Sequence, residues 1–186
     1  SKGQDDIKTV GDKADKIFLA GALANNIFKE RGLELGTSLV SEVSSDLRGI
    51  SNNDRVVTPV EVTVTNSKGE VINRKANELQ KDECIVDIGH ETIKQLESLV
   101  KESKTILWNG PLGNYELGFQ DKTEVLAKMV ADVTNSETIS IVGGGDTIAS
   151  INKLGLNERF TFISTGGGAM LDFLVNETLV GIDALK

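Results

Sequence analysis

Short apolar runs rich in β-branched residues alternate along this chain with longer stretches whose apolar residues recur every three or four positions. Such runs predict buried strands, and the recurring positions predict amphipathic helices. The apolar runs that precede helical stretches are Ile17–Ala20, Ile85–Asp87, Thr105–Trp108, Ile139–Val142 and Phe160–Ile163. This alternation predicts an α/β fold, a Rossmann-like three-layer sandwich with a mainly parallel sheet and helices on both faces.

The segment between the first two of these units departs from the alternation. Ser38–Leu47 could hold a short helix. Val60–Thr65 and Val71–Arg74 are β-rich and are joined through a short polar turn, which predicts a hairpin. We expect residues 1–186 to form a single domain, because a chain of this length supports one substantial core. Residues 1–11 are polar without clear periodicity and are expected to be a ragged N-terminal segment.

Three glycine-bearing loops are the most informative local feature. They are Trp108–Glu116, Gly143–Thr147 and Ser164–Ala169, and each lies between a predicted strand and a predicted helix. A glycine loop that opens a helix directs unpaired backbone N–H groups and the positive end of the helix dipole at one place, which suits phosphate. Right-handed crossovers put every strand-to-helix turn on one edge of a parallel sheet. We therefore expect these loops to converge, together with Gly21 and the Val86–Gly89 turn, on one ligand-binding crevice.

The charges of the three glycine loops restrict how they could bind phosphate. None of them contains Lys or Arg, so bound phosphate would rest on backbone amides, with a metal ion or another segment supplying positive charge. Asp146 is the one carboxylate at a glycine-loop helix start, where it is either an N-cap or a Mg²⁺ ligand beside phosphate. The position of Asp146 alone favours the N-cap interpretation, whereas the presence of the other two glycine loops favours the metal-ligand interpretation. One residue can serve both roles. Glu116 could accept from ribose hydroxyls, although its position alone favours a solvated loop charge.

Composition argues against several classes of function. The chain has 186 residues, a formal net charge of −8 and a pI near 4.8, which argues against binding nucleic acid or an anionic membrane surface. No apolar run approaches the roughly 20 residues of a membrane span. Cys84 is the single cysteine, which leaves no intrachain disulfide and favours a reducing, cytoplasmic location. The sequence contains no P-loop, no dinucleotide-binding G-x-G-x-x-G after its first strand and no Cys/His cluster for zinc.

With these motifs in place, the chain resembles the C-terminal, nucleotide-binding half of the phosphoglycerate kinase family. The three glycine loops occur in that family's order and approximate spacing, and the resemblance runs from about Asp12 to Leu185. Shorter matching pieces are Ala20-Gly21-Ala22-Leu23-Ala24, Leu39-Val40 and Asp87-Ile88-Gly89.

The resemblance implies reversible transfer of a phosphoryl group between 1,3-bisphosphoglycerate and Mg-ADP, a step of glycolysis. It implies that the amides of Gly166, Gly167 and Gly168 receive the phosphoryl group in flight and that Asp146 holds Mg²⁺, directly or through water. It also implies that Glu116 binds the ribose hydroxyls, which reverses the preference from position alone. The nucleotide-binding residues that it implies are Gly21, Val86, Asn109, Pro111, Gly113, Asn114, Glu116, Gly143, Gly144, Gly145 and Thr147.

The family's N-terminal domain, with the basic residues that bind 3-phosphoglycerate, is absent from these 186 residues, as is the Gly-Gly-Ala-Lys segment that supplies a phosphate-binding lysine. We therefore expect a monomer that binds ADP or ATP without turnover. Two alternatives remain open at this point. One is a stand-alone nucleotide-binding module with no catalytic partner. The other is an NAD-dependent Rossmann protein, which the missing fingerprint disfavours.

Overall fold

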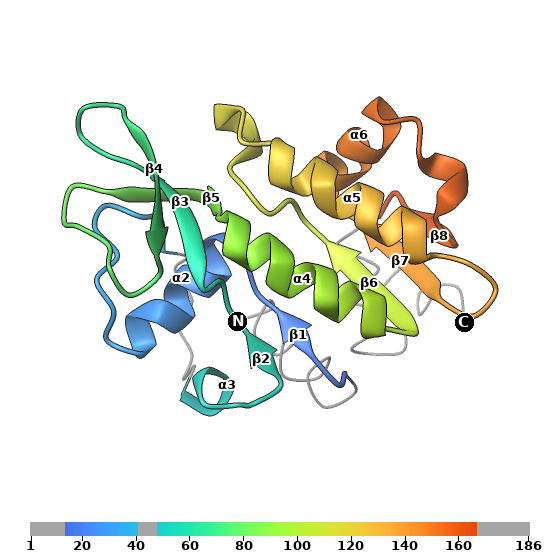
Figure 1. The fold of residues 1–186 in the computed structure, drawn as a ribbon, viewed down its shortest axis with the longest axis horizontal. Helices are drawn as coiled ribbons and strands as arrows, with labels where there is room; N and C mark the ends of the chain where they lie inside the picture. The colour runs from blue at the N-terminus through green and yellow to red at the C-terminus, as the bar shows by residue number, and fades with distance from the viewer. Residues whose placement is uncertain (1–13, 41–47, 167–186) are drawn as a thin grey trace, which may run out of the picture. The chain divides into compact units, whose positions relative to one another are not determined.

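The computed structural model describes residues 14–40 and 48–166 of the chain, which divides into two compact units (Figure 1). The first unit contains the described residues up to Gln95 together with Leu112–Lys122. The second contains Leu96–Pro111 and the described residues from Thr123 onward. The predicted helix over Ser38–Leu47 lies largely outside the described residues. No helix of the described ranges is long and apolar enough to cross a membrane.

The first unit begins with a strand, a turn and a helix, as the pattern predicts. Strand β1 (Ile17–Phe18) pairs in parallel with β2 (Val56–Val57), and helix α2 (Gly21–Glu30) follows β1 after two residues. A short helix, α3 (Arg48–Ser51), precedes β2. The buried face of α2 joins a hydrophobic core made of Leu19, Ala24, Ile27, Phe28, Leu35, Val56, Val62, Val64, Ala76 and Leu79.

A second sheet of the first unit contains the predicted hairpin. Strands β3 (Glu61–Thr65) and β4 (Val71–Lys75) are antiparallel neighbours, and β5 (Cys84–Ile88) pairs with the other edge of β3, also antiparallel. This sheet is the antiparallel exception to the predicted parallel arrangement. β4 and β5 lie on opposite edges of β3, and residues 76–83, which contain no helix, link them.

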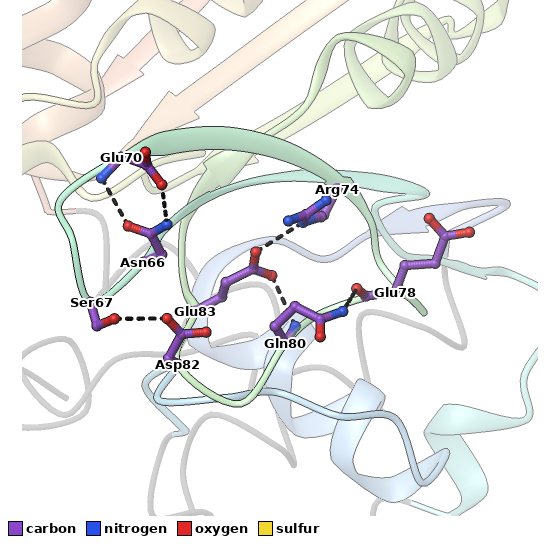
Figure 2. A network of polar contacts seen from close by, with 8 residues as sticks. All are labelled: Asn66, Ser67, Glu70, Arg74, Glu78, Gln80, Asp82 and Glu83. Carbon is purple, nitrogen blue, oxygen red and sulfur yellow. Dashed lines mark hydrogen bonds and ion pairs between the residues drawn. The ribbon is translucent and has the colours of Figure 1, made fainter.

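Polar contacts fix the hairpin and the link that follows it (Figure 2). The side chains of Asn66 and Ser67 bond to Glu70 and Asp82, respectively. Deeper in the unit, the carboxylate of Glu83 is 2% exposed and lies 2.9 Å from Arg74 Nε. It also accepts a hydrogen bond of 2.9 Å from the backbone amide of Gln80. A buried carboxylate is stable only when it is paired and hydrogen-bonded, so these two contacts explain how Glu83 is accommodated.

The start of helix α4 (His90–Glu102) is tied to β3. The buried Thr92 hydroxyl donates to the carbonyl of Glu61 and accepts from the amides of Val60 and Glu61. The Glu61 carboxylate in turn accepts from the amide of Glu91 in the first turn of the helix. The contact to Glu91 satisfies one helix N-terminal donor, and together these contacts tie the first turn of α4 to β3.

The second unit is built on three parallel strands in the order β6-β7-β8. They are β6 (Thr105–Asn109), β7 (Ile139–Gly143) and β8 (Phe162–Ser164), with helices α5 (Asp121–Val133) and α6 (Gly145–Lys153) in the connections. Val130, Ala131, Val142 and Ile151 are completely buried and form the centre of this unit. The predicted α/β class, with parallel strands flanked by helices, is confirmed.

Candidate nucleotide-binding site

The carboxyl ends of β6, β7 and β8 meet at one edge of the parallel sheet. Asn109, the last residue of β6, pairs with Gly143, the last residue of β7, and Gly143 pairs with Ser164 at the end of β8. The turns that follow therefore leave the sheet side by side. Within this unit, the strands that precede the three glycine loops end at one edge of the sheet, as expected, and residues 167–169 of the third loop lie outside the described residues.

The turns after β6 and β7 approach each other closely. Gly144 has a φ of 93°, a conformation that L side chains rarely adopt, and a Cβ there would lie 3.0 Å from the amide nitrogen of Gly110. The same Cβ would lie 3.4 Å from the side-chain oxygen of Asn109. The indole nitrogen of Trp108 donates to the carbonyl of Gly110 at 2.8 Å and fixes the neighbouring turn. A bare backbone at Gly144 is therefore required for these two turns to adjoin.

Helix α6 begins in this glycine turn, and no described side chain caps its N-terminus. Gly144 is the N-cap residue and makes no side-chain cap bond. Gly145, the first helical residue, is exposed, and no described atom lies within 4 Å of where its Cβ would stand. Asp146 is the second helical residue, so the interpretation of Asp146 as the N-cap is wrong. Its side chain is exposed and bonds to no other described residue.

Thr147 presents an unusual buried hydroxyl in the first turn of α6. The residue is completely buried, and its Oγ1 has no hydrogen-bond partner among the described residues. Ser150, one turn later on the same helix, is also completely buried with an unpaired hydroxyl. Leaving such a group unsatisfied costs about 1–3 kcal/mol. The first turn of α6 therefore contains a buried hydroxyl that no described group satisfies.

The other predicted residues of the second unit are placed as follows. Pro111 is half-buried in the turn after β6, and Gly166 is exposed after the end of β8. Gly167 and Gly168 lie outside the described residues. Among the described residues, no group of three or more His, Cys, Asp or Glu side chains could hold a metal ion by itself.

The remaining predicted residues, Gly21, Val86, Gly113, Asn114 and Glu116, belong to the first unit. The structure joins two of them directly, because the amide of Asn114 donates to the carbonyl of Val86 at 2.7 Å. The Asn114 side chain is engaged locally and accepts from the amide of Leu117 in the 3₁₀ turn η1 (Tyr115–Leu117). Glu116 is exposed within that turn, and Gly21 is exposed as the first residue of α2.

Asp87 was expected at this edge only as part of the Val86–Gly89 turn, and no role of its own was predicted for it. Its side chain is buried near the end of β5, with 6% of the residue exposed. A Cβ on Gly113 would lie 2.5 Å from the Asp87 carboxyl carbon, so the loop backbone packs directly on this carboxyl group. The sequence did contain an indication of this buried carboxyl group, because Asp87 lies within the apolar run from Ile85 to Ile88.

Comparison with known proteins shows the family to which this chain belongs. The phosphoglycerate kinase family model matches residues 2–177. The chain belongs to the phosphoglycerate kinase family. It is 35% identical over 178 residues to the phosphoglycerate kinase of Mannheimia succiniciproducens, covering 93% of this chain and 46% of that protein. It is 37% identical over 186 residues to that of Prochlorococcus marinus strain MIT 9312, covering 94% of this chain and 46% of that protein.

Solved phosphoglycerate kinases have the same fold. The structure of the enzyme from Coxiella burnetii matches with a TM-score of 0.84 and 30% identity, covering 99% of this chain and 49% of that one. The structure from Pyrococcus horikoshii matches with a TM-score of 0.73 and 27% identity, covering 100% of this chain and 49% of that one. The chain thus spans about half the length of the phosphoglycerate kinases that it matches.

Within this phosphoglycerate kinase fold, the buried Asp87 carboxyl has an altered acidity. Burial raises the pKa of Asp87 to about 7 from its ordinary value of 3.8. The hydrogen bond from the Ile88 amide and the charge of Lys122 act in the opposite direction, and the charge of Asp121 raises the pKa further. The carboxyl group is therefore largely uncharged below neutral pH.

This shift predicts a decrease in stability as the pH rises. Between about pH 4 and pH 7 the folded chain holds a proton on Asp87 that the unfolded chain has lost, so the free energy of unfolding decreases, by at most about 1.4 kcal/mol per pH unit. We expect Asp87→Asn, which mimics the uncharged carboxyl, to lack this component and to be more stable than the native chain at pH 8. Urea unfolding at pH 5, 6, 7 and 8 measures the free energy of unfolding of both chains and its dependence on pH. The exposed Asp54→Asn is the control, and identical pH profiles for the native chain and Asp87→Asn would contradict the shift.

Proposed function

We propose that this chain is the nucleotide-binding half of a phosphoglycerate kinase and binds Mg-ADP and Mg-ATP. As part of the complete enzyme it would serve the transfer of a phosphoryl group between 1,3-bisphosphoglycerate and ADP in glycolysis. The observation that carries the proposal is the open N-terminus of α6, where a bare glycine turn adjoins the turn after β6 and the Thr147 hydroxyl is buried without a described partner. Backbone amides at a helix N-terminus bind phosphate without a cationic side chain.

The residues at this edge fit a magnesium–nucleotide complex. Mg²⁺ is usually held by one or two carboxylates together with substrate phosphates and waters, rather than by a cage of protein ligands. Asp146 supplies one such carboxylate, exposed and not bonded to another described residue. Bound there, the ion would neutralise charge on the phosphates, which the glycine loops cannot do because they contain no Lys or Arg.

Each predicted residue then has a role in binding. The amides of Gly143, Gly144 and Gly145 face the nucleotide phosphates, the Thr147 hydroxyl bonds a phosphate oxygen, and Asn109 lies near the phosphates. Gly166, Gly167 and Gly168 receive the phosphoryl group in flight. The adenosine is bound by Gly21, Val86, Pro111, Gly113 and Asn114, and Glu116 accepts from its ribose hydroxyls. Phosphoryl transfer needs mainly such positioning and charge stabilisation from the protein.

Calorimetric titration with Mg-ADP tests the binding function. We expect saturable heat with the native chain and an affinity at least about tenfold lower for Asp146→Ala, because a carboxylate contact to the metal is lost. The exposed Asp146 side chain has no described partner, so its removal should leave the free energy of unfolding within about 0.5 kcal/mol of the native value. Absence of heat from the native chain at millimolar Mg-ADP would refute the proposal.

A separate experiment tests the link to turnover. We propose that the chain by itself binds nucleotide without turnover, because in the family the basic residues that bind 3-phosphoglycerate lie in the N-terminal domain. Mixing the chain with a separately produced N-terminal half of a phosphoglycerate kinase should then restore activity. Tight association without activity would favour the alternative of a non-catalytic nucleotide-binding module.

A further inference from the structure

The loop Leu112–Gln120 is held against the end of β5 by two contacts. One is the hydrogen bond of 2.7 Å from the Asn114 amide to the Val86 carbonyl. The other is the packing of Gly113 on the Asp87 carboxyl, which is so close that a Cβ on Gly113 would stand 2.6 Å from Asp87 Oδ1. The residues of these contacts that are proposed to line the adenosine pocket are Val86, Gly113 and Asn114. Asp87 is not among them and contacts this loop through Gly113.

The surroundings of the Asp87 carboxyl are suited to its uncharged form. The carbonyl oxygen of Phe119 would lie 2.6 Å from the same Gly113 Cβ, so two acceptor oxygens face one glycine. Ile88 donates the one described hydrogen bond to the carboxyl, at 2.8 Å from its backbone amide. No described Lys or Arg lies within ion-pair distance of Asp87. A negative charge here would be largely desolvated and would lie beside a second acceptor.

The charged groups around Asp87 do not neutralise it. On α5, Lys122 attracts and Asp121 repels a negative charge on Asp87. The Lys122 ammonium lies 3.3 Å from Nδ1 of His90, at the start of α4, rather than on Asp87. From β3, Thr63 pairs with Asp87 in the ladder and is uncharged, and the Glu61 carboxylate binds the amide of Glu91. The loop itself contributes the exposed Glu116.

We propose that Asp87 is a positioning residue for nucleotide binding: its uncharged carboxyl supports the loop Leu112–Gln120, and its ionisation releases this loop from β5. Nucleotide affinity then decreases as the pH rises through neutrality, because the released loop no longer presents Gly113 and Asn114 to the adenosine. The effect on affinity rests on the function proposed above. The effect on the loop does not require a nucleotide.

Amide hydrogen exchange at Asn114 tests the loop directly. In the native chain, the protection of this amide relative to its intrinsic exchange rate should decrease up to about tenfold between pH 7 and pH 8. In Asp87→Asn, which can keep the bond from the Ile88 amide and cannot ionise, protection should stay constant. Asp54→Asn, an exposed carboxylate in the same unit, should behave as the native chain. Equal pH dependence in the native chain and Asp87→Asn would overturn the proposal.

Calorimetry with Mg-ADP at pH 6 and pH 8 tests the consequence for binding. ADP titrates in this range as well, so the readout is the ratio of dissociation constants between the native chain and Asp87→Asn at each pH. We expect a ratio near one at pH 6 and up to about ten at pH 8. A ratio that does not change with pH would overturn the positioning role. If none of the chains binds Mg-ADP, the proposed function fails, and the exchange at Asn114 still decides whether Asp87 holds the loop.

Discussion

Gly145→Ala should weaken Mg-ADP binding about a hundredfold without destabilising the fold. Gly145 is the exposed first residue of α6, and no described atom lies within 4 Å of where a Cβ would stand. Alanine in a helix is favoured over glycine by about 0.5–1 kcal/mol, so the free energy of unfolding should be unchanged or slightly higher. In the proposed complex, however, the new methyl group occupies the space of a phosphate and breaks charge-assisted bonds worth about 1.5–3 kcal/mol each.

Calorimetry and urea unfolding on the same samples separate these two effects. The control is Ala149→Ser, one turn later on α6 at another exposed position, which should change neither quantity appreciably. Native-like affinity in Gly145→Ala would mean that phosphate does not approach the start of α6. A large loss of stability would mean that the space beside Gly145 is filled.

Gly36→Ala should lower the free energy of unfolding by about 3 kcal/mol. Gly36 has a φ of 55°, and a Cβ there would collide with the carbonyl oxygen of Glu83 and stand 2.6 Å from that of Gln80. Both atoms belong to the backbone of the link before β5, so relief of the clash requires that this link moves. The movement would break the bond of 2.8 Å from the Thr37 amide to the Glu83 carbonyl and disturb the ion pair between Arg74 and the buried Glu83 shown in Figure 2.

Gly32→Ala is the matched control for Gly36→Ala. Gly32 has a φ of 75°, but no described atom lies within 4 Å of its Cβ position. Its substitution therefore measures the conformational cost alone, about 1–2 kcal/mol. Urea unfolding followed by circular dichroism compares the two variants. Equal losses would show that the close approach of Gly36 to the link contributes nothing.

The elements and the glycine turns of the second unit were predictable because their determinants are local. Apolar runs such as Ile139–Val142 form strands in any parallel sheet, and the chain direction then fixes which ends carry the turns. The predicted strand bounds agree with the observed ones to within two residues. The family was predictable for the same reason, because its motifs occupy these turns.

Features that depend on distant contacts were not predictable. The acidity of Asp87 depends on the loop around Gly113, which is far along the sequence. The place of β5 in its sheet depends on a segment distant in sequence: β4 pairs with one edge of β3, and β5 pairs with the other edge. At α6, position alone favours Asp146 as the N-cap, but Gly144, which approaches Gly110 closely, is the N-cap residue, and Asp146 is exposed.

Mapping of backbone amide shifts by NMR during titration with Mg-ADP tests the central claim most directly. If the glycine turns at the ends of β6 and β7 bind the nucleotide phosphates, the largest shift changes will be those of Gly110, Gly143, Gly144 and Gly145. These changes will saturate together and will be weaker in Asp146→Ala. Changes confined to other segments, such as the β3–β4 hairpin, with these four amides unaffected, would contradict it.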